Sequence, residues 1–98
     1  MHAIYRVRTV RVVAPYVVEV SFDDGAVREV DLEPILYGEL YGPLRDPAFF
    51  AAVTVDPEIA TIVWPNGADF DPETLHDWPS HRDAFIARAK EWQHARSA

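Results

Sequence analysis

Two alternating hydrophobic runs joined by Asp-Asp-Gly constrain the fold of this chain more than any other feature. Residues 16–22 and 26–32 each alternate apolar and polar side chains, as half-buried strands do. Asp24-Gly25 between them predicts a hairpin, because a type I′ turn needs positive φ at both central residues and Gly adopts it without steric cost. We therefore expect two antiparallel neighbouring strands. The side chains expected in the core are Val18, Val20, Phe22, Val30 and Leu32.

Three further segments have the composition of strands. Residues 3–13 are rich in β-branched and aromatic side chains, and their alternation shifts near Arg8 and Thr9, which indicates a bulge or twist there. Short runs at 53–55 and 60–64 flank an Asp-Pro pair that we interpret as a turn. These segments predict a small antiparallel sheet of about five strands.

Helix starts are indicated by residues that cap free N–H groups. Asp accepts hydrogen bonds from the first turn of a helix, and Pro fits the first helical position. Asp46 therefore predicts a short middle helix, and Asp71 predicts a capped helix near 72–78. Ser80 begins an approximate capping box ahead of an amphipathic helix at 80–96. The apolar stripe expected on that helix comprises Phe85, Ile86, Ala89 and Trp92.

The segment 33–46 is the least regular part of the chain. Its two Gly and two Pro interrupt any long helix, yet it is too apolar for a free loop. We expect a helical turn at 34–37, then an ordered and partly buried loop that is a good place for recognition.

These elements predict one α+β domain over residues 1–78, with a C-terminal helix at 79–98 packed on the same domain or on a partner. A chain of 98 residues has room for one core.

The charge is unevenly distributed. The formal net charge is −7, and thirteen of the sixteen acidic residues lie between positions 23 and 77. An acidic centre repels phosphates, so nucleic-acid binding is not expected, and a basic protein partner fits better. A weaker alternative is a DNA-associated regulator in which Arg6, Arg8 and Arg11 contact phosphates.

Several kinds of chemistry have no support in the sequence. The chain has no cysteine, no serine within G-x-S-x-G and no glycine-rich phosphate loop, so we expect neither an enzyme nor a bound cofactor. It also lacks a signal-peptide pattern and a run of about 18 apolar residues, which predicts a cytoplasmic protein without a membrane span.

The stretch WPNGADFDPETLHDW, 64–78, is the best candidate for a bound ion. Asn66-Gly67 is most simply a tight turn, and the glycine precedes the acids, unlike in a calcium loop. We therefore favour a structural role and expect no metal. The alternative is a small-ligand or divalent-metal domain that uses Asp69, Asp71, Glu73 and His76.

Two motifs are more specific: G-P-L-R-D-P-x-x-F at 42–50 and W-P-N-G-A-D-F-D-P-E-x-L at 64–75. With them, residues 5–78 resemble the bacterial family called domain of unknown function 2442 (DUF2442). The resemblance implies a small α+β domain with no established activity or functional residues. It also implies a neighbouring gene for a small protein of a second family, DUF4160, in a toxin–antitoxin-like pair of which this member is the antitoxin.

Two surfaces are candidates for binding a protein partner. One is the acidic middle around two tyrosines, where Asp46, Asp69 and Asp71 add charge. The other is the C-terminal helix, which could instead form a homodimer. The residues expected to contact a partner are Glu33, Tyr37, Glu39, Tyr41, Arg82, Trp92 and Arg96.

Overall fold

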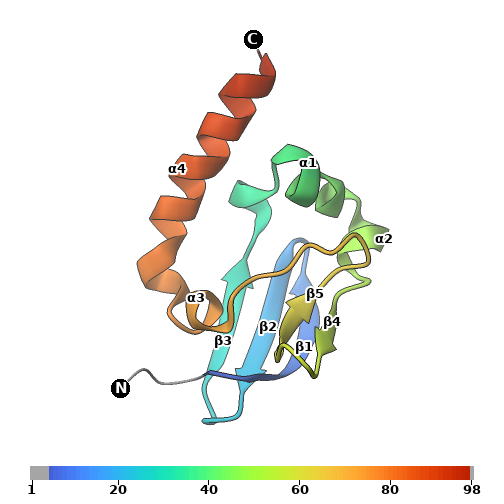
Figure 1. The fold of residues 1–98 in the computed structure, drawn as a ribbon, viewed down its shortest axis with the longest axis vertical. Coiled ribbons are helices and arrows are strands. Elements are labelled where there is room, and N and C mark those ends of the chain that lie inside the picture. The colour runs from blue at the N-terminus through green and yellow to red at the C-terminus, as the bar shows by residue number, and fades with distance from the viewer. Residues whose placement is uncertain (1–4, 98) are drawn as a thin grey trace.

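The computed structural model describes residues 5–97, with side chains through Glu91, and confirms an α+β fold (Figure 1). The strands form two antiparallel sheets, one of three strands in the order β1-β2-β3 and one of two strands, β4-β5. The expected single sheet of about five strands is therefore wrong. β4 and β5 pair with each other, and they pack against β1 without joining its ladder. The strands are β1 Val7–Ala14, β2 Val17–Phe22, β3 Val27–Asp31, β4 Thr54–Asp56 and β5 Thr61–Val63.

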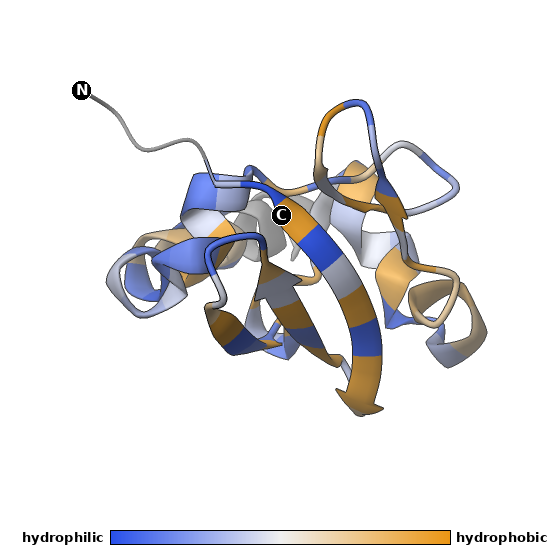
Figure 2. Ribbon diagram, turned by 90° about the horizontal axis from the view of Figure 1, so that it is seen from below, coloured by the Kyte–Doolittle hydropathy of each residue, from blue (hydrophilic) through white to orange (hydrophobic). Residues whose placement is uncertain are grey.

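Strand β1 contains the expected bulge. Its pairing with β2 shifts register between Val7 and Thr9, and the strand curves visibly (Figure 2). Beyond the shift, Val12 lies opposite Val18, on the side of the sheet that faces the core. β1 begins later than expected: residues 3 and 4 lie outside the described part of the chain, and residues 5–6 precede the strand.

The hairpin between β2 and β3 is confirmed, but its turn type is not I′. Gly25 has φ +89, whereas Asp24 is not in the left-handed region. The amide of Gly25 donates to the carbonyl of Phe22 at 3.1 Å, and the amide of Ala26 donates to Asp24 Oδ1 at 2.9 Å. This is the longer loop in which a type I turn is followed by a left-handed glycine.

The turn after β5 repeats that geometry. The amide of Gly67, which has φ +88, donates to the carbonyl of Trp64 at 2.9 Å. The amide of Ala68 donates to Asn66 Oδ1 at 3.0 Å, as Ala26 does to Asp24. The expected tight turn at Asn66-Gly67 is confirmed.

The segment after β3 is more helical than expected. A 3₁₀ turn, η1 (Glu33–Ile35), confirms the expected helical turn, but a second turn, α1 (Gly38–Tyr41), and a third, η2 (Gly42–Arg45), replace the expected loop. Pro lies in the first turn of both η1 and η2, where its missing N–H has no intrahelical partner. Leu36 and Leu44 are fully buried and hold the segment onto the core.

Asp46 caps the middle helix as predicted. Its side chain accepts from the amide of Ala48 at 3.0 Å at the start of α2 (Pro47–Phe50). Asp71 precedes α3 (Pro72–His76), but its side chain makes no capping hydrogen bond, so that part of the prediction is wrong.

The last helix, α4 (Trp78–Ser97), begins before Ser80, so the expected capping box is wrong. The amide of Ser80 donates to the carbonyl of Asp77 at 2.8 Å, which places this serine inside the first turn. α4 runs along one side of the domain, and its C-terminal end projects past α1 (Figure 1). Within residues 5–97, no helix combines the length and apolar character needed to cross a membrane.

A chain of aromatic rings joins α2 to α4 through the core. The ring centre of Trp64 lies 5.7 Å from that of Phe50 and 6.0 Å from that of Phe70. The ring centre of Phe70 in turn lies 6.1 Å from that of Phe85 in α4. The first half of α4 therefore packs on its own domain, where Ala89 is fully buried. All five core residues expected from the hairpin are buried.

Candidate functional site

The clearest candidate site is a shallow hollow of about 290 Å³ on the α1 turn. We call it the Tyr hollow; it is lined by Tyr37, Gly38, Glu39, Leu40 and Tyr41. Leu40 is 43% exposed although it is apolar, and Glu39 beside it is also exposed. Gly38, the first residue of α1, adopts φ +89, a conformation that glycine tolerates without steric cost.

One wall of the Tyr hollow is held by Arg45. Its guanidinium carbon lies 4.5 Å from the centre of the Tyr37 ring, a cation–π contact. Arg45 Nε also donates to the carbonyl of Leu36 at 2.7 Å, and a terminal nitrogen donates to the carbonyl of Glu33 at 3.4 Å. The cation is therefore fixed beside the hollow and closes the 33–45 segment on itself.

The other wall is held by Tyr41. Its ring stacks on Phe70 at 5.0 Å, and its hydroxyl donates to the carbonyl of Asp69 at 3.0 Å. Burial raises the pKa of the Tyr41 phenol, and the Asp69 carboxylate raises it further, whereas the Arg88 guanidinium lowers it.

The 64–68 turn is joined by side-chain hydrogen bonds to α1 and α2. Asn66 Nδ2 donates to the carbonyl of Leu40 at 2.9 Å, and Trp64 Nε1 donates to the carbonyl of Phe50 at 2.9 Å. Asn66 and Trp64 therefore shape the backbone, as predicted for this stretch, whereas the predicted cap by Asp71 does not form.

The structure brings together three of the seven residues expected to contact a partner: Tyr37, Glu39 and Tyr41 line one hollow. Glu33 does not line the hollow, but its main-chain carbonyl accepts a hydrogen bond from Arg45, which contacts Tyr37. Arg82 lies on α4 and does not line the hollow; it is exposed, and its Nη1 atom lies 3.6 Å from Asp83 Oδ1. The side chains of Trp92 and Arg96 lie outside the described residues.

Sequence reasoning missed two parts of this site. Leu40 was expected among partly buried residues, because an isolated leucine in a short segment gives no sign of which way it points. The cation beside Tyr37, Arg45, comes from η2, and no motif links it to that ring.

The candidate ion ligands are divided between two places. Asp69 and Asp71 line a different shallow hollow of about 310 Å³. His76 instead stacks on Tyr5 at 3.8 Å, with Nε2 2.9 Å from Asp24 Oδ2. Among the side chains of residues 5–91, no three His, Asp or Glu are arranged to hold a metal ion. The metal alternative therefore stays a prediction without support from this geometry.

The three N-terminal arginines differ in their surroundings. Arg6 and Arg8 are exposed, whereas Arg11 Nε lies 3.0 Å from Glu19 Oε1 across the β1–β2 pair. The hydrogen bond and charge of Glu19 raise the pKa of Arg11. One of the three cations proposed for phosphate contact is thus paired within the sheet, and DNA binding stays a prediction.

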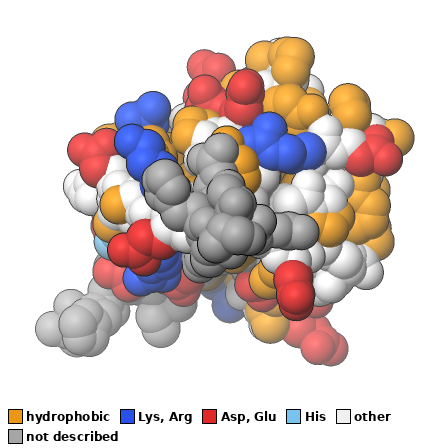
Figure 3. Space-filling view, turned by 90° about the horizontal axis from the view of Figure 1, so that it is seen from above, with side chains coloured by type: hydrophobic (Ala, Val, Ile, Leu, Met, Phe, Trp, Pro, Cys, Tyr) orange, Lys and Arg blue, Asp and Glu red, His pale blue; other side chains and the backbone are white. Residues whose placement is uncertain are grey.

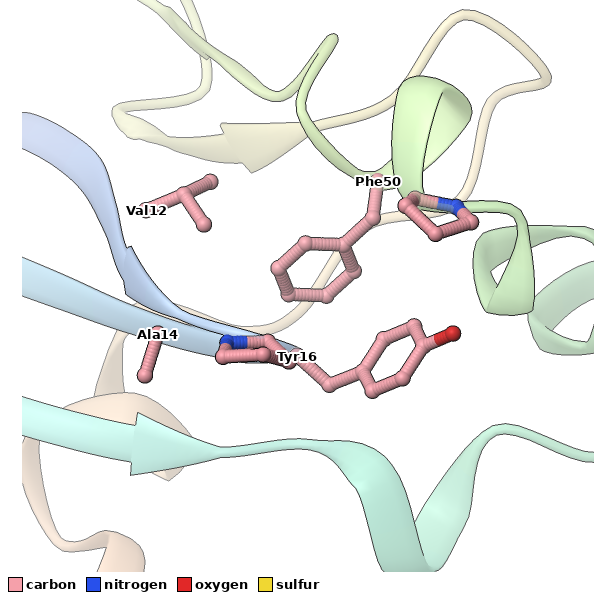
Figure 4. Close-up of a pocket in the computed structure, with 6 residues that line it drawn as sticks. Val12, Ala14, Tyr16 and Phe50 are labelled. Carbon is pink, nitrogen blue, oxygen red and sulfur yellow. The ribbon is translucent and has the colours of Figure 1, made fainter.

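A second concavity was not expected from the sequence. It is an apolar groove of about 270 Å³ between the end of β1 and α2 (Figure 4). Val12 is 39% exposed there although it points to the core side of the sheet. Phe50 and Tyr16 contact each other edge-on at 5.5 Å, and Tyr16 has φ +62, an unusual conformation for a bulky side chain. The groove is lined by Val12, Ala14, Pro15, Tyr16, Pro47 and Phe50.

Charges are mixed on the end of the molecule from which α4 projects. In Figure 3, Lys and Arg side chains lie among Asp and Glu side chains, and hydrophobic side chains gather along the right margin. A partner approaching this end meets a pattern of both signs. Such patterns favour selective rather than general attraction.

The fold and the hollow define a small α+β domain with a preformed surface concavity. The chain belongs to the family of proteins of unknown function DUF2442, whose family model matches residues 7–79. This confirms the resemblance seen in the sequence. No curated protein matches the chain, and no solved structure matches it either.

Proposed function

We propose that this chain is a non-catalytic protein-interaction module that binds a small basic protein through the Tyr hollow. The proposed partner is the DUF4160-like product of a neighbouring gene, and the pair would act in the cytoplasm as a toxin–antitoxin-like system. In that system this chain is the antitoxin-like member, which binds and masks its partner.

The observation that carries the proposal is the exposure of Leu40 inside a rigid frame. Its side chain is 43% exposed and lies between two anchored tyrosines. Tyrosine and exposed apolar side chains are typical of the centres of protein interfaces. Because Arg45 and Asn66 already fix the backbone here, little conformational entropy is lost when a partner binds.

Charge supports a basic partner. The chain carries a formal net charge of −7, and Glu39 is exposed at the hollow itself. Opposite net charges raise association rates, and the effect weakens as salt increases.

The C-terminal helix is a second proposed contact, either for the same partner or for a second copy of the chain. The exposed Arg82 is the described residue that supports it.

Co-expression tests the proposal. The neighbouring gene should slow growth when expressed alone and become harmless with this chain, and the two proteins should co-purify. A partner that is toxic to the same extent with and without this chain, and that never co-purifies with it, would contradict the proposal.

A further inference from the structure

Asn66 and Gly67 form the single Asn-Gly pair of the sequence, and both are exposed at the turn after β5. In such a pair, the backbone nitrogen of the glycine can attack Cγ of the asparagine side chain. Glycine favours the attack because it has no Cβ to hinder the approach and its backbone angles vary freely. Asparagine is accordingly among the thermolabile residues of proteins.

The attack would form a cyclic imide, a succinimide. A bond forms between the Gly67 nitrogen and Asn66 Cγ, and the bond from Cγ to Nδ2 breaks. Ammonia leaves and takes with it the proton from the Gly67 amide. Water then opens the ring at either carbonyl and gives aspartate or, with the side-chain carbon in the main chain, isoaspartate. The reaction consumes water, releases ammonia and needs neither an enzyme nor an oxidant.

In the folded chain, each polar group that must react is held by a hydrogen bond. The Gly67 amide donates to the carbonyl of Trp64 at 2.9 Å. Asn66 Oδ1 accepts from the amide of Ala68 at 3.0 Å, and Nδ2 donates to the carbonyl of Leu40 at 2.9 Å. The side chain is therefore fixed at both ends and cannot turn toward the Gly67 nitrogen without losing these contacts. Of the three bonds, the one to Leu40 joins the turn to another segment, α1.

The reaction would also remove the contact that restrains it. Both products lack the Nδ2 donor, so neither can donate from this position to the Leu40 carbonyl. In the aspartate product a carboxylate oxygen, which is only an acceptor, would face that carbonyl. In the isoaspartate product the main chain of the turn is longer by one carbon. Either change separates the turn from α1.

We propose that Asn66 is a site of spontaneous deamidation that is controlled by its hydrogen bond to the Leu40 carbonyl. The side chain reacts only while the 64–68 turn is detached from α1, and the product then keeps the turn detached. The turn thus acts as an irreversible switch on the segment that lines the Tyr hollow. The inference is independent of the proposed function, because the reaction and its structural effect both occur in the isolated chain.

The first test compares the full chain with a capped peptide of residues 62–70, which gives the rate of the open turn. Both are incubated in the same mildly alkaline buffer, and mass spectrometry with fragmentation follows deamidation at Asn66. The full chain should react at least about tenfold more slowly, because its hydrogen bonds must break first. Equal rates would overturn the inference, since the fold would then not restrain Asn66.

Two glycines of the neighbouring segment test the role of α1. Gly38 begins α1 with φ +89, so Gly38→Ala strains this turn, whereas Gly42 has φ −54 and open space for a Cβ. Gly38→Ala should raise the deamidation rate of the folded chain by about five- to thirtyfold, the factor that corresponds to the cost of a left-handed alanine. Gly42→Ala, the matched control, should leave the rate within about twofold. The same rate in both variants would show that α1 does not control the reaction.

The deamidated chain, separated from the unmodified chain by anion exchange, tests the effect of the product. The amide of Gly42 donates to the carbonyl of Gly38 and so reports on α1. Hydrogen exchange at this amide should be about two- to tenfold faster after deamidation, as expected for the loss of one supporting hydrogen bond. Asn66→Asp, which lacks the same donor, should change the exchange in the same direction. Unchanged exchange in the deamidated chain would contradict the switch.

Discussion

The side-chain amide of Asn66 donates to the main-chain carbonyl of Leu40 at 2.9 Å and so joins the turn after β5 to the helical turn that forms the Tyr hollow. The same side chain accepts from the amide of Ala68 at 3.0 Å. One residue thus closes its own turn and supports a segment 26 positions away. Within the 64–78 stretch, this asparagine thus provides backbone support for a surface formed by another segment.

Asn66→Ala should remove both hydrogen bonds and lower the free energy of unfolding by about 1–2 kcal/mol. Asn66→Asp keeps the acceptor for the Ala68 amide but cannot donate to the Leu40 carbonyl, so it separates the two contributions. Urea denaturation of the three proteins measures both effects. A fully stable alanine variant would show that the contact to Leu40 does not support α1.

The two left-handed turn glycines should resist substitution for a backbone reason alone. An added Cβ would meet nothing within 4 Å at Gly25 or at Gly67, yet both have φ near +90. Each Gly→Ala change should therefore cost about 1–2 kcal/mol.

Gly42 is the matched control for these substitutions. It also has open space for a Cβ, but its φ of −54 is helical. Gly42→Ala should be neutral or stabilise the chain by up to about 1 kcal/mol, because alanine reduces the freedom of the unfolded chain. Equal costs at all three glycines in thermal unfolding would contradict the backbone explanation.

Trp64→Phe should destabilise the core through a lost hydrogen bond and lost volume. The indole is almost fully buried and donates to the carbonyl of Phe50, which would be left without that donor. The expected cost is about 1–3 kcal/mol, from the lost hydrogen bond and the cavity, because the Phe50 carbonyl still accepts from the amide of Val53 at 3.3 Å. Tryptophan fluorescence is confounded by the change itself, so unfolding is followed by circular dichroism. A cost under about 1 kcal/mol would show that the core repacks around the smaller ring.

Stability should fall in acid partly because of Asp24. The amide of Ala26 lowers the pKa of this carboxyl, and the hydrogen bond and charge of His76 lower it further. A carboxyl with a depressed pKa in the folded state stabilises the fold above its unfolded pKa, near 4, and that contribution is lost as pH falls through the folded value.

Asp24→Asn tests this assignment, because the amide oxygen can still accept from Ala26 but cannot titrate. The difference in unfolding free energy between pH 7 and pH 3 should be smaller in the variant. An unchanged pH dependence would mean that other carboxyls account for the acid sensitivity.

Much of the fold could be predicted because it is set by local patterns. The hairpin, the bulge near Arg8, the Asp46 cap and the turn at Asn66-Gly67 each depend on residues close in sequence. The division into two sheets could not be predicted, since it depends on how the short β4–β5 pair lies against β1. The early start of α4 was missed because Ser80 had a plausible capping role that the structure does not use.

The site was predicted only in part for the same reason. Tyr37, Glu39 and Tyr41 are neighbours in one segment, and in the structure they line the same hollow, as expected. The hydrogen bond from Asn66 to the carbonyl of Leu40 instead joins two segments that lie 26 positions apart. Tertiary contacts of this kind leave no periodic signal in the sequence.

The most direct test of the interaction proposal replaces two exposed aliphatic residues by Glu, one at a time, and measures the affinity of each variant for the purified partner. Leu40 in the Tyr hollow and Ile59 in the β4–β5 turn are both exposed, at 43% and 49%. Leu40→Glu should weaken binding measured by isothermal titration calorimetry by about tenfold or more, which corresponds to about 1.4 kcal/mol. Ile59→Glu should leave the affinity within about twofold of the unmodified chain. Equal affinities for the Leu40→Glu variant and the unmodified chain would contradict the claim that the Tyr hollow is the binding surface.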